Sequence, residues 1–235
     1  MKRIIVLSVS FLLIAAVIGL YSNATFKDGG VISISNIEDI RLLNCNITQI
    51  FDEDDTFGVF KNAYAEQRLA ELNAMDFILV VKPANHIREY NFTLTQRVQI
   101  AEVIKGDAAV GEFAELVSSG GVYDQKYRAI EYFNSRPVYS GFINLLLPDN
   151  EYLVFVNALE TNELTDLKRY RIESPFFCVL NLTSDYSRPV DKPVNALTYN
   201  DFDESEFFCQ SDKIRDRILE VKRHILQEIK GVKSG

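Results

Sequence analysis

The chain has 235 residues, which suits one globular domain with a short extension, since domains commonly span about 100–200 residues. A composition of 47% hydrophobic and 25% charged residues, with 11 Gly and 6 Pro, excludes a disordered or fibrous chain. The net charge of −8 disfavours nucleic acid and anionic lipid surfaces as partners, because both are bound through excess cationic charge.

The N-terminus carries an apolar run over residues 4–21, directly after Lys2 and Arg3. This layout predicts a signal peptide or membrane anchor over residues 1–24, with a small-residue cleavage point at Ser22-Asn23-Ala24. As a helix the run would reach roughly 27 Å, nearly the thickness of a hydrocarbon core, so it can also stay uncleaved. Everything from Thr25 onward is then extracytoplasmic, either secreted or anchored in the cell membrane by residues 4–21.

Residues 25–60 read as a polar approach segment before the folded domain, which we expect over residues 61–235. Ser35-Asn36-Ile37-Glu38 matches a capping box and predicts a short helix through Leu43. The acidic run over residues 52–55 is interpreted as a solvated loop, because Gly58 comes too late for a calcium-binding loop.

The middle of the chain is rich in strand patterns. A helix is expected over residues 62–74, followed by a buried strand over residues 76–81. The next stretch alternates and predicts a long strand with one face in water: apolar side chains lie at even positions, Phe92, Leu94, Val98, Ile100 and Ile104, and polar ones at odd positions, Thr93, Thr95, Arg97, Gln99 and Lys105. Val103 breaks the alternation and indicates a bulge. Gly106-Asp107 ends this strand.

Four further strands and a closing helix complete the pattern. We expect strands over residues 112–118 and 152–156, and over residues 169–172 and 176–182 either two strands or one strand bent at Pro175. An irregular insert is expected over residues 122–142 and loops over residues 183–203. A helix over residues 211–230 carries one apolar stripe and ends at Gly231. Strands flanked by two helices predict a mainly β fold, either a small antiparallel barrel or an α+β domain.

The order of these elements resembles the netrin-like domain, the OB-type barrel of the tissue inhibitors of metalloproteinases and their bacterial relatives. The resemblance covers residues 62–182 and rests on residues 76–81, on Glu102-Val-Ile-Lys-Gly-Asp107, on the Val110-Gly111 and Gly120-Gly121 turns, and on Asn150-Glu-Tyr-Leu-Val-Phe-Val156. It implies an OB-like antiparallel β-barrel with one helix before and one after it. Protease inhibition is not carried over, because the family uses an N-terminal Cys and here Cys45 lies well inside the chain.

The three cysteines, Cys45, Cys178 and Cys209, suit one disulfide and one remaining thiol in an exported protein, and their spacing does not choose the pair. The resemblance implies a bridge from the segment before the first helix to a later strand. It therefore favours Cys45–Cys178, with Cys209 as the alternative partner.

Obvious catalytic or metal motifs do not occur, and the two distant histidines favour neither a zinc site nor another cofactor. One enzyme hypothesis remains: His86, Cys178 and Arg188 resemble the His-Cys-Arg set of sortase transpeptidases, in which a thiolate attacks a peptide carbonyl. Phe177 stands where sortases have Thr, and a structural Cys in a strand is the competing interpretation.

The main functional hypothesis is a non-enzymatic binding module at the cell surface for a protein, peptide or glycan. It rests on the aromatic side chains of the insert, because Tyr combines apolar area with a polar tip and OB-type barrels bind through inter-strand loops and one sheet face. The alternative is that these rings close the mouth of the barrel. The candidate binding residues are Tyr123, Tyr127, Tyr132, Phe133 and Tyr139.

Overall fold

The computed structural model describes residues 34–52, 58–61, 63–90, 93–118, 121–123, 137–159, 166–174 and 176–233. The predicted signal peptide or anchor lies outside these ranges. Chain contacts separate Met1–Ser33 from a compact unit, Ile34–Gly235. Residues 34–52 therefore fold as part of the compact unit, and they are not the separate approach segment that the sequence suggests.

The first helix of this unit, α2 (Ile37–Leu43), begins one residue later than the predicted capping box. Asn36 is the N-cap: its Oδ1 accepts hydrogen bonds from the backbone N–H of Glu38 at 2.9 Å and of Asp39 at 3.2 Å. The Asp39 carboxylate accepts in return from the backbone N–H of Asn36. Each side chain therefore accepts a hydrogen bond from a backbone N–H group of the other residue that has no partner within the helix. Ile37 and Ile40 anchor the helix by burial.

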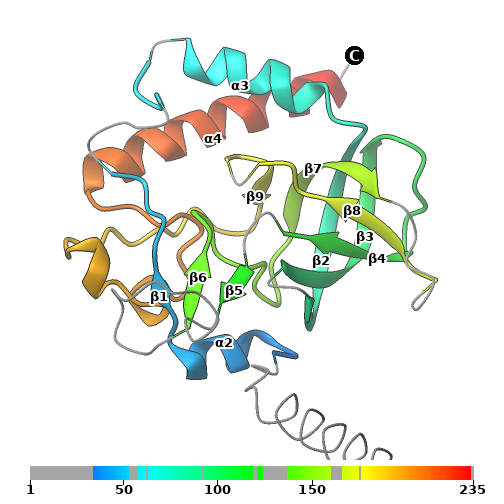
Figure 1. The fold of residues 1–235 in the computed structure, drawn as a ribbon. Helices are drawn as coiled ribbons and strands as arrows, with labels where there is room; N and C mark the ends of the chain where they lie inside the picture. Colours follow the sequence, from blue (N-terminus) through cyan, green and yellow to red (C-terminus); the bar gives the residue numbers. More distant parts are fainter. Residues whose placement is uncertain are drawn as a thin grey trace, which may run out of the picture. The chain divides into compact units, whose positions relative to one another are not determined.

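The larger sheet has six strands, and the strand pairings form a circuit that begins and ends at β2. β2 is antiparallel to β3, β3 to β4, β8 to β7 and β7 to β2, while β4 and β8 are parallel; β9 extends the sheet beside β7 (Figure 1). The fold is thus mainly β with a C-terminal helix. The strands are β2 (Phe77–Tyr90), β3 (Thr93–Lys105), β4 (Phe113–Val117), β7 (Tyr152–Leu159), β8 (Lys168–Arg171) and β9 (Val179–Asn181).

The predicted alternation of β3 is confirmed in part. Leu94, Val98 and Ile100 are buried and Gln99 is exposed, but Thr95 on the predicted water face is buried as well. The predicted bulge near Val103 is also present, because the register shifts between the Ile78–Lys105 and Leu79–Val103 pairs. Strand β2 continues to residue 90, well past the predicted end at residue 81. A further register shift between Pro83 and Ile87 accommodates the polar segment that lies between these two residues.

A second sheet of three short strands corrects the prediction of an irregular insert. β1 (Asn46–Ile47) is parallel to β6 (Val138–Ser140), which is antiparallel to β5 (Gly121–Tyr123). Two 3₁₀ turns, η2 (Val194–Ala196) and η3 (Tyr199–Phe202), lie in the predicted loop region. The bridge from Asn46 to Thr198 ties this region to β1.

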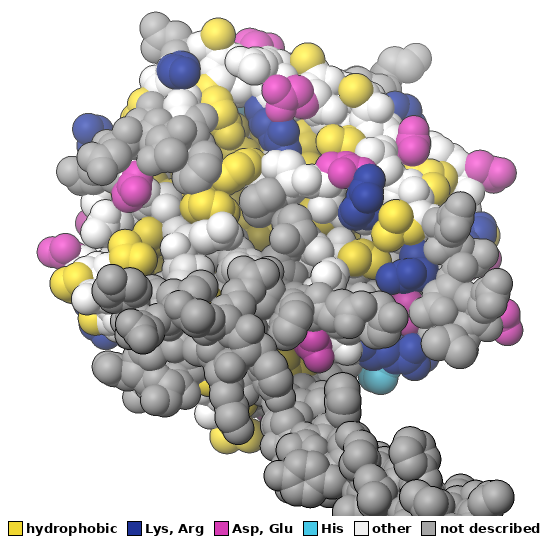
Figure 2. All heavy atoms as spheres, viewed as in Figure 1, with side chains coloured by type: hydrophobic (Ala, Val, Ile, Leu, Met, Phe, Trp, Pro, Cys, Tyr) yellow, Lys and Arg dark blue, Asp and Glu magenta, His cyan; other side chains and the backbone are white. Residues whose placement is uncertain are grey.

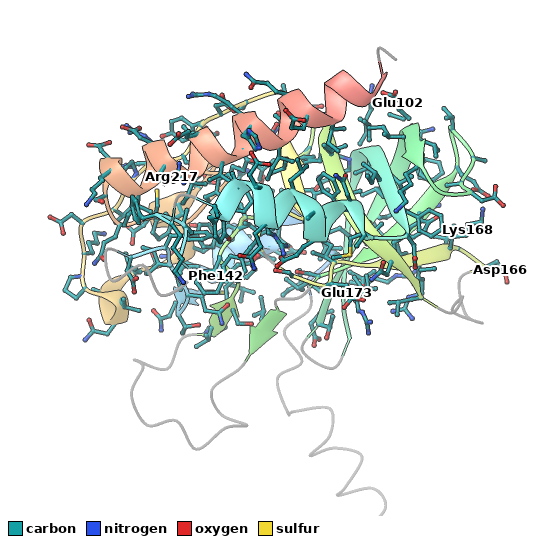
Figure 3. All side chains as sticks on the ribbon, turned by 90° about the horizontal axis from the view of Figure 1, so that it is seen from above. Glu102, Phe142, Asp166, Lys168, Glu173 and Arg217 are labelled. Carbon is teal, nitrogen blue, oxygen red and sulfur yellow. The ribbon has the colours of Figure 1, made fainter. Side chains whose placement is uncertain are left out.

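Helices α3 (Tyr64–Asn73) and α4 (Asp212–Lys233) confirm the two predicted helices and lie side by side (Figures 1 and 3). The predicted stop at Gly231 is wrong, because α4 runs through this residue. The predicted apolar stripe of α4 is buried in the main core; it comprises Ile214, Ile218, Val221, Ile225 and Ile229. In the described part of the chain, no helix combines the length and apolar character that a membrane span needs.

Arg217 fastens α4 to the segment that precedes α3, and Figure 3 labels this residue on the helix. Its Nε donates a hydrogen bond of 2.9 Å to the carbonyl of Val59, and its Nη2 donates one of 3.2 Å to that of Lys61. Arg68 does the same for α3, since its Nε donates to the carbonyl of Phe176 at 2.8 Å. The helices are therefore held in place by charged hydrogen bonds to loop carbonyls as well as by apolar packing.

Candidate functional site

The outward side of β3, β4 and β8 carries a row of charged side chains. Arg97 on β3 lies opposite Glu115 on β4, and Glu115 lies opposite Arg169 on β8. Because successive side chains of a strand point to opposite faces, this row faces away from the core that holds Val98 and Leu116. We call the outward surface formed by five residues the arginine face; they are Arg88, Arg97, Phe113, Glu115 and Arg169.

Glu115 is the centre of the arginine face and is almost fully buried, with 4% of its surface exposed. One carboxylate oxygen lies 3.7 Å from Arg88 Nη1, and the other lies 3.6 Å from Arg169 Nε. Both distances allow charge attraction but exceed the usual length of a hydrogen bond. A buried carboxylate is tolerated only beside opposite charge, and here the arginines supply that charge.

Arg97 lies on the other side of Glu115 and stacks on an aromatic ring. Its guanidinium carbon is 4.7 Å from the centroid of Phe113, whose side chain is a large apolar group with 41% exposure. Arg97 Nε is buried without a hydrogen-bond acceptor, and so is Arg169 Nε. Buried N–H groups without acceptors are uncommon and call for an explanation.

The cations next to the arginine face are already paired. Arg171, two positions after Arg169 on β8, donates from Nη2 to Glu173 at 2.6 Å, and this hydrogen bond holds the pKa of the Glu173 carboxyl below its usual range. Lys168 donates to Glu112 at 3.1 Å. Lys168 and Glu173 are labelled in Figure 3 at the two ends of this part of the chain. Arg97 differs, because no carboxylate of the described residues is its ion-pair partner.

The charge of the arginine face contrasts with that of the whole chain. Three arginines facing one glutamate leave a local charge of +2 in a protein of net charge −8. Figure 2 shows dark-blue side chains gathered over the side of the molecule formed by β3, β4 and β8, with magenta ones between them. This local excess attracts anions over about one Debye length, roughly 8–10 Å at physiological salt.

The predicted aromatic binding site is corrected at Tyr139. This residue is 2% exposed, its hydroxyl donates to the carbonyl of Ile143 at 2.9 Å, and its ring packs against Tyr199 and Phe208. Tyr139 therefore belongs to the core and offers no surface to a ligand. Burial also raises its pKa well above the ordinary value for Tyr. Tyr127, Tyr132 and Phe133 lie outside the described residues, as does the side chain of Tyr123.

The sortase-like set is not assembled in the structure. Cys178 is fully buried, and burial raises the pKa of its thiol; its Sγ lies 3.3 Å from Arg68 Nη2. The Cys178 carbonyl accepts from Phe155, which pairs with Ile78 on β2. His86 lies eight positions further along that strand, which amounts to more than about 20 Å at 3.3 Å per residue.

The other two members of that set have different neighbours. His86 Nε2 accepts a hydrogen bond of 3.3 Å from Arg88 Nε, at the margin of the arginine face. Arg188 is exposed, and its backbone N–H donates to Ser205 Oγ at 2.9 Å. The charged group at the Cys178 thiol is Arg68, and the described contacts of His86 and Arg188 do not include this thiol.

The predicted Cys45–Cys178 disulfide is absent from the structure, in which Cys45, Cys178 and Cys209 are free, buried thiols. The two predicted partners have different surroundings. The carbonyl of Cys45 accepts from Tyr199 beside the second sheet, whereas Cys178 lies next to Arg68 of α3. Burial raises the pKa of Cys45 and of Cys209 to about 12.

Among the described residues, no group of three or more His, Cys, Asp or Glu side chains is arranged to hold a metal ion. Neither protein-family models nor curated protein sequences match this chain. The arginine face is therefore the candidate site with the strongest geometric support. Sequence reasoning missed it, although the outward position of Arg97 follows from the alternation of β3.

Proposed function

We propose that this protein is an exported, non-enzymatic binding module, secreted or held at the cell membrane by residues 4–21, and that it binds its ligand on the arginine face. The proposed scaffold is an OB-like barrel. Its support is the circuit of pairings through β2, β3, β4, β8 and β7, which has the five strands of an OB-type barrel and leaves β2 with a partner on each side.

One observation carries the proposed binding role: Arg97 stacks on the exposed Phe113 and, unlike Arg88 and Arg169, has no carboxylate of the described residues as its ion-pair partner. A purely structural ion-pair network would be expected to pair each of its cations, because a hydrogen bond to a charged group contributes about 1.5–3 kcal/mol. An acidic or polar group of a ligand would supply the missing partner of Arg97. Three of its five residues, Arg97, Phe113 and Glu115, lie on the second and third strands of the circuit, and the outward face of these strands is a usual binding surface of OB-type barrels.

The test is a sedimentation assay of the full-length protein with isolated envelopes of the cells that produce it. We expect saturable binding, and at least tenfold weaker binding of the double variant Arg97→Gln/Arg169→Gln, since it removes two of the three cations of the arginine face. Arg223→Gln is the matched control, because Arg223 is a 60% exposed arginine on α4. Binding that never saturates, or equal loss in the control, would overturn the proposal.

A further inference from the structure

We infer that the protein has a second binding site, a cavity that takes an aliphatic polyamine and shares no residue with the arginine face. The cavity has a volume of about 740 Å³, within the range of about 300–1,000 Å³ that is usual for small-molecule sites. We call it the aspartate cavity after the three carboxylate side chains that line it, Asp52, Asp191 and Asp212.

Backbone hydrogen bonds hold the walls of the aspartate cavity in place. The N–H of Gln210 donates to the carbonyl of Phe51 at 3.1 Å, and the N–H of Val190 donates to the carbonyl of Cys209 at 3.0 Å. These bonds tie together three segments that lie far apart in the sequence. Because the walls are already ordered, little conformational entropy is lost when a ligand enters.

The aspartate cavity carries negative charge that the protein does not neutralise. Arg215 pairs with Asp212 at 2.5 Å, but in the described part of the chain no cation forms an ion pair with Asp52 or Asp191. The inner oxygen of Asp52, Oδ1, is buried and accepts no hydrogen bond, so this carboxylate is not compensated from the protein side either. A hollow lined by one sign of charge concentrates ligands of the opposite sign.

The lysines that adjoin the aspartate cavity in the sequence interact with other groups. Lys192 follows Asp191, but its Nζ lies 2.5 Å from Asp201. Lys213, in the first turn of α4, has its Nζ 5.2 Å from the centroid of the Phe60 ring, a distance typical of a cation–π contact. These lysines therefore leave the cavity without a counter-charge, and a cationic ligand would supply it.

The placement of the carboxylates favours an organic cation over a metal ion. Three aspartates line the cavity, yet no three acidic, His or Cys side chains of the described residues converge closely enough to hold a metal ion. Calcium, for example, needs several oxygen ligands at roughly 2.3–2.6 Å from one point. A polyamine spreads its ammonium groups along a flexible chain, so that each group can pair with a different carboxylate.

The remaining walls suit the rest of such a ligand. Pro189 and Val194 are the apolar residues that line the cavity, and Val194 is 39% exposed. The methylene groups between the nitrogens of a polyamine can pack on them, as the stem of a lysine side chain packs on apolar surface. Gln210 and Ser211, which also line the cavity, offer oxygen acceptors to the remaining N–H groups.

The experiment is calorimetric titration of the full-length protein with spermidine, in neutral detergent at pH 7 and low salt. The matched probe is diacetylspermidine, in which both terminal ammonium groups are neutral amides on the same chain. We expect spermidine to bind saturably and at least tenfold more tightly than diacetylspermidine, because the terminal charges pair with the uncompensated carboxylates. Asp52→Asn or Asp191→Asn should weaken spermidine binding at least fivefold.

Glu220→Gln is the control variant, because Glu220 is a 68% exposed carboxylate of α4 that does not line the cavity. It should change spermidine binding less than twofold, and circular dichroism and urea unfolding verify that each variant is folded. Equal binding of the two probes, no saturable binding, or an equal loss in Glu220→Gln would overturn the inference. Calcium that displaces spermidine and depends on Asp52 and Asp191 would identify a metal site and overturn it as well.

The aspartate cavity and the arginine face are tested independently. The double variant Arg97→Gln/Arg169→Gln should bind spermidine as the wild type does, whereas Asp191→Asn should bind isolated envelopes as the wild type does. Loss of spermidine binding in the arginine variant would show that spermidine does not report on the aspartate cavity, and would overturn the inference. Failure of the envelope assay alone would overturn the proposed function and leave the polyamine site in place.

Discussion

Lys222 on α4 and Glu206 form an ion pair inside the protein. Lys222 is fully buried, its Nζ lies 2.6 Å from Glu206 and 2.8 Å from Asp185, and it donates to the carbonyl of Ser184 at 3.0 Å. Glu206 also accepts from the backbone N–H of Asn181. Burial raises the pKa of Glu206 to about 7, although Lys222 acts in the opposite direction. This pair fixes α4 to the loop before it at the cost of desolvating two charges.

Lys222→Met should make stability strongly dependent on pH. A carboxyl whose folded pKa is raised stabilises the protein below its unfolded pKa of about 4.5, and this contribution is lost as pH rises through the folded pKa, here about 7. Without Lys222 the pKa of Glu206 rises further. We therefore expect the free energy of unfolding of Lys222→Met to be slightly below the wild-type value at pH 5. Above pH 7 it should keep falling by about 1.4 kcal/mol per pH unit, whereas the contribution of Glu206 to the wild-type value no longer changes there.

Urea unfolding between pH 5 and 8 measures this difference. Lys192→Met is the control, because Lys192 is 48% exposed and its partner Asp201 has a pKa lowered from 3.8, outside the range studied. The free energy of unfolding of the control should differ from that of the wild type by less than about 1 kcal/mol, and by the same amount at every pH. Parallel pH profiles of Lys222→Met and the wild type would show that Glu206 is not the titrating partner.

The turn after β3 requires glycine. The sequence indicated a turn at Gly106, but it did not show how closely another side chain packs against it. Gly106 and Gly111 both have positive φ, 100° and 89°. A Cβ at Gly106 would lie 2.2 Å from a ring carbon of Phe77, whereas a Cβ at Gly111 would have no heavy atom within 4 Å. Only the folded hairpin brings Phe77 of β2 against this turn.

We therefore expect Gly106→Ala to cost clearly more stability than Gly111→Ala. The second variant suffers only backbone strain of about 1 kcal/mol, while the first adds a clash with a packed ring, for a total of about 2–4 kcal/mol. Urea unfolding of both variants at one pH gives the comparison. Similar losses would mean that Phe77 moves aside, although its ring also packs on Tyr170 at 4.9 Å.

The state of the cysteines concerns the whole molecule. All three thiols are buried, and at pH 8 a thiol with a pKa of about 12 is almost entirely protonated, as for Cys45 and Cys209. We expect iodoacetamide at pH 8 to leave the native protein unlabelled for minutes, and to add three labels once urea unfolds it without a reductant. A single label after unfolding would indicate one disulfide among the three cysteines, in contrast to the free thiols of the structure. The same mass spectrum measures whether residues 1–24 are retained.

Much of the fold could be predicted because its signals are local. The alternation of β3, the apolar stripe of α4 and the turn at Gly106 each depend on residues close together in the chain. The short strand β6 and the inclusion of residues 34–52 were missed, since both are stabilised by partners far away, such as Thr198 opposite Asn46. Tyr139 was misassigned for the same reason, because an aromatic-rich segment fits a core and a surface equally well.

By itself the sequence determined the periodicity: where the longer strands and the helices α3 and α4 lie, and that Arg97 faces away from the core. Only the tertiary structure decided which strands are neighbours. Residues 115 and 169 meet because β4 and β8 pair in parallel, a contact that no local pattern encodes. Hydrophobic alternation specifies the face of a strand, whereas the charges that gather on that face depend on how distant strands are paired.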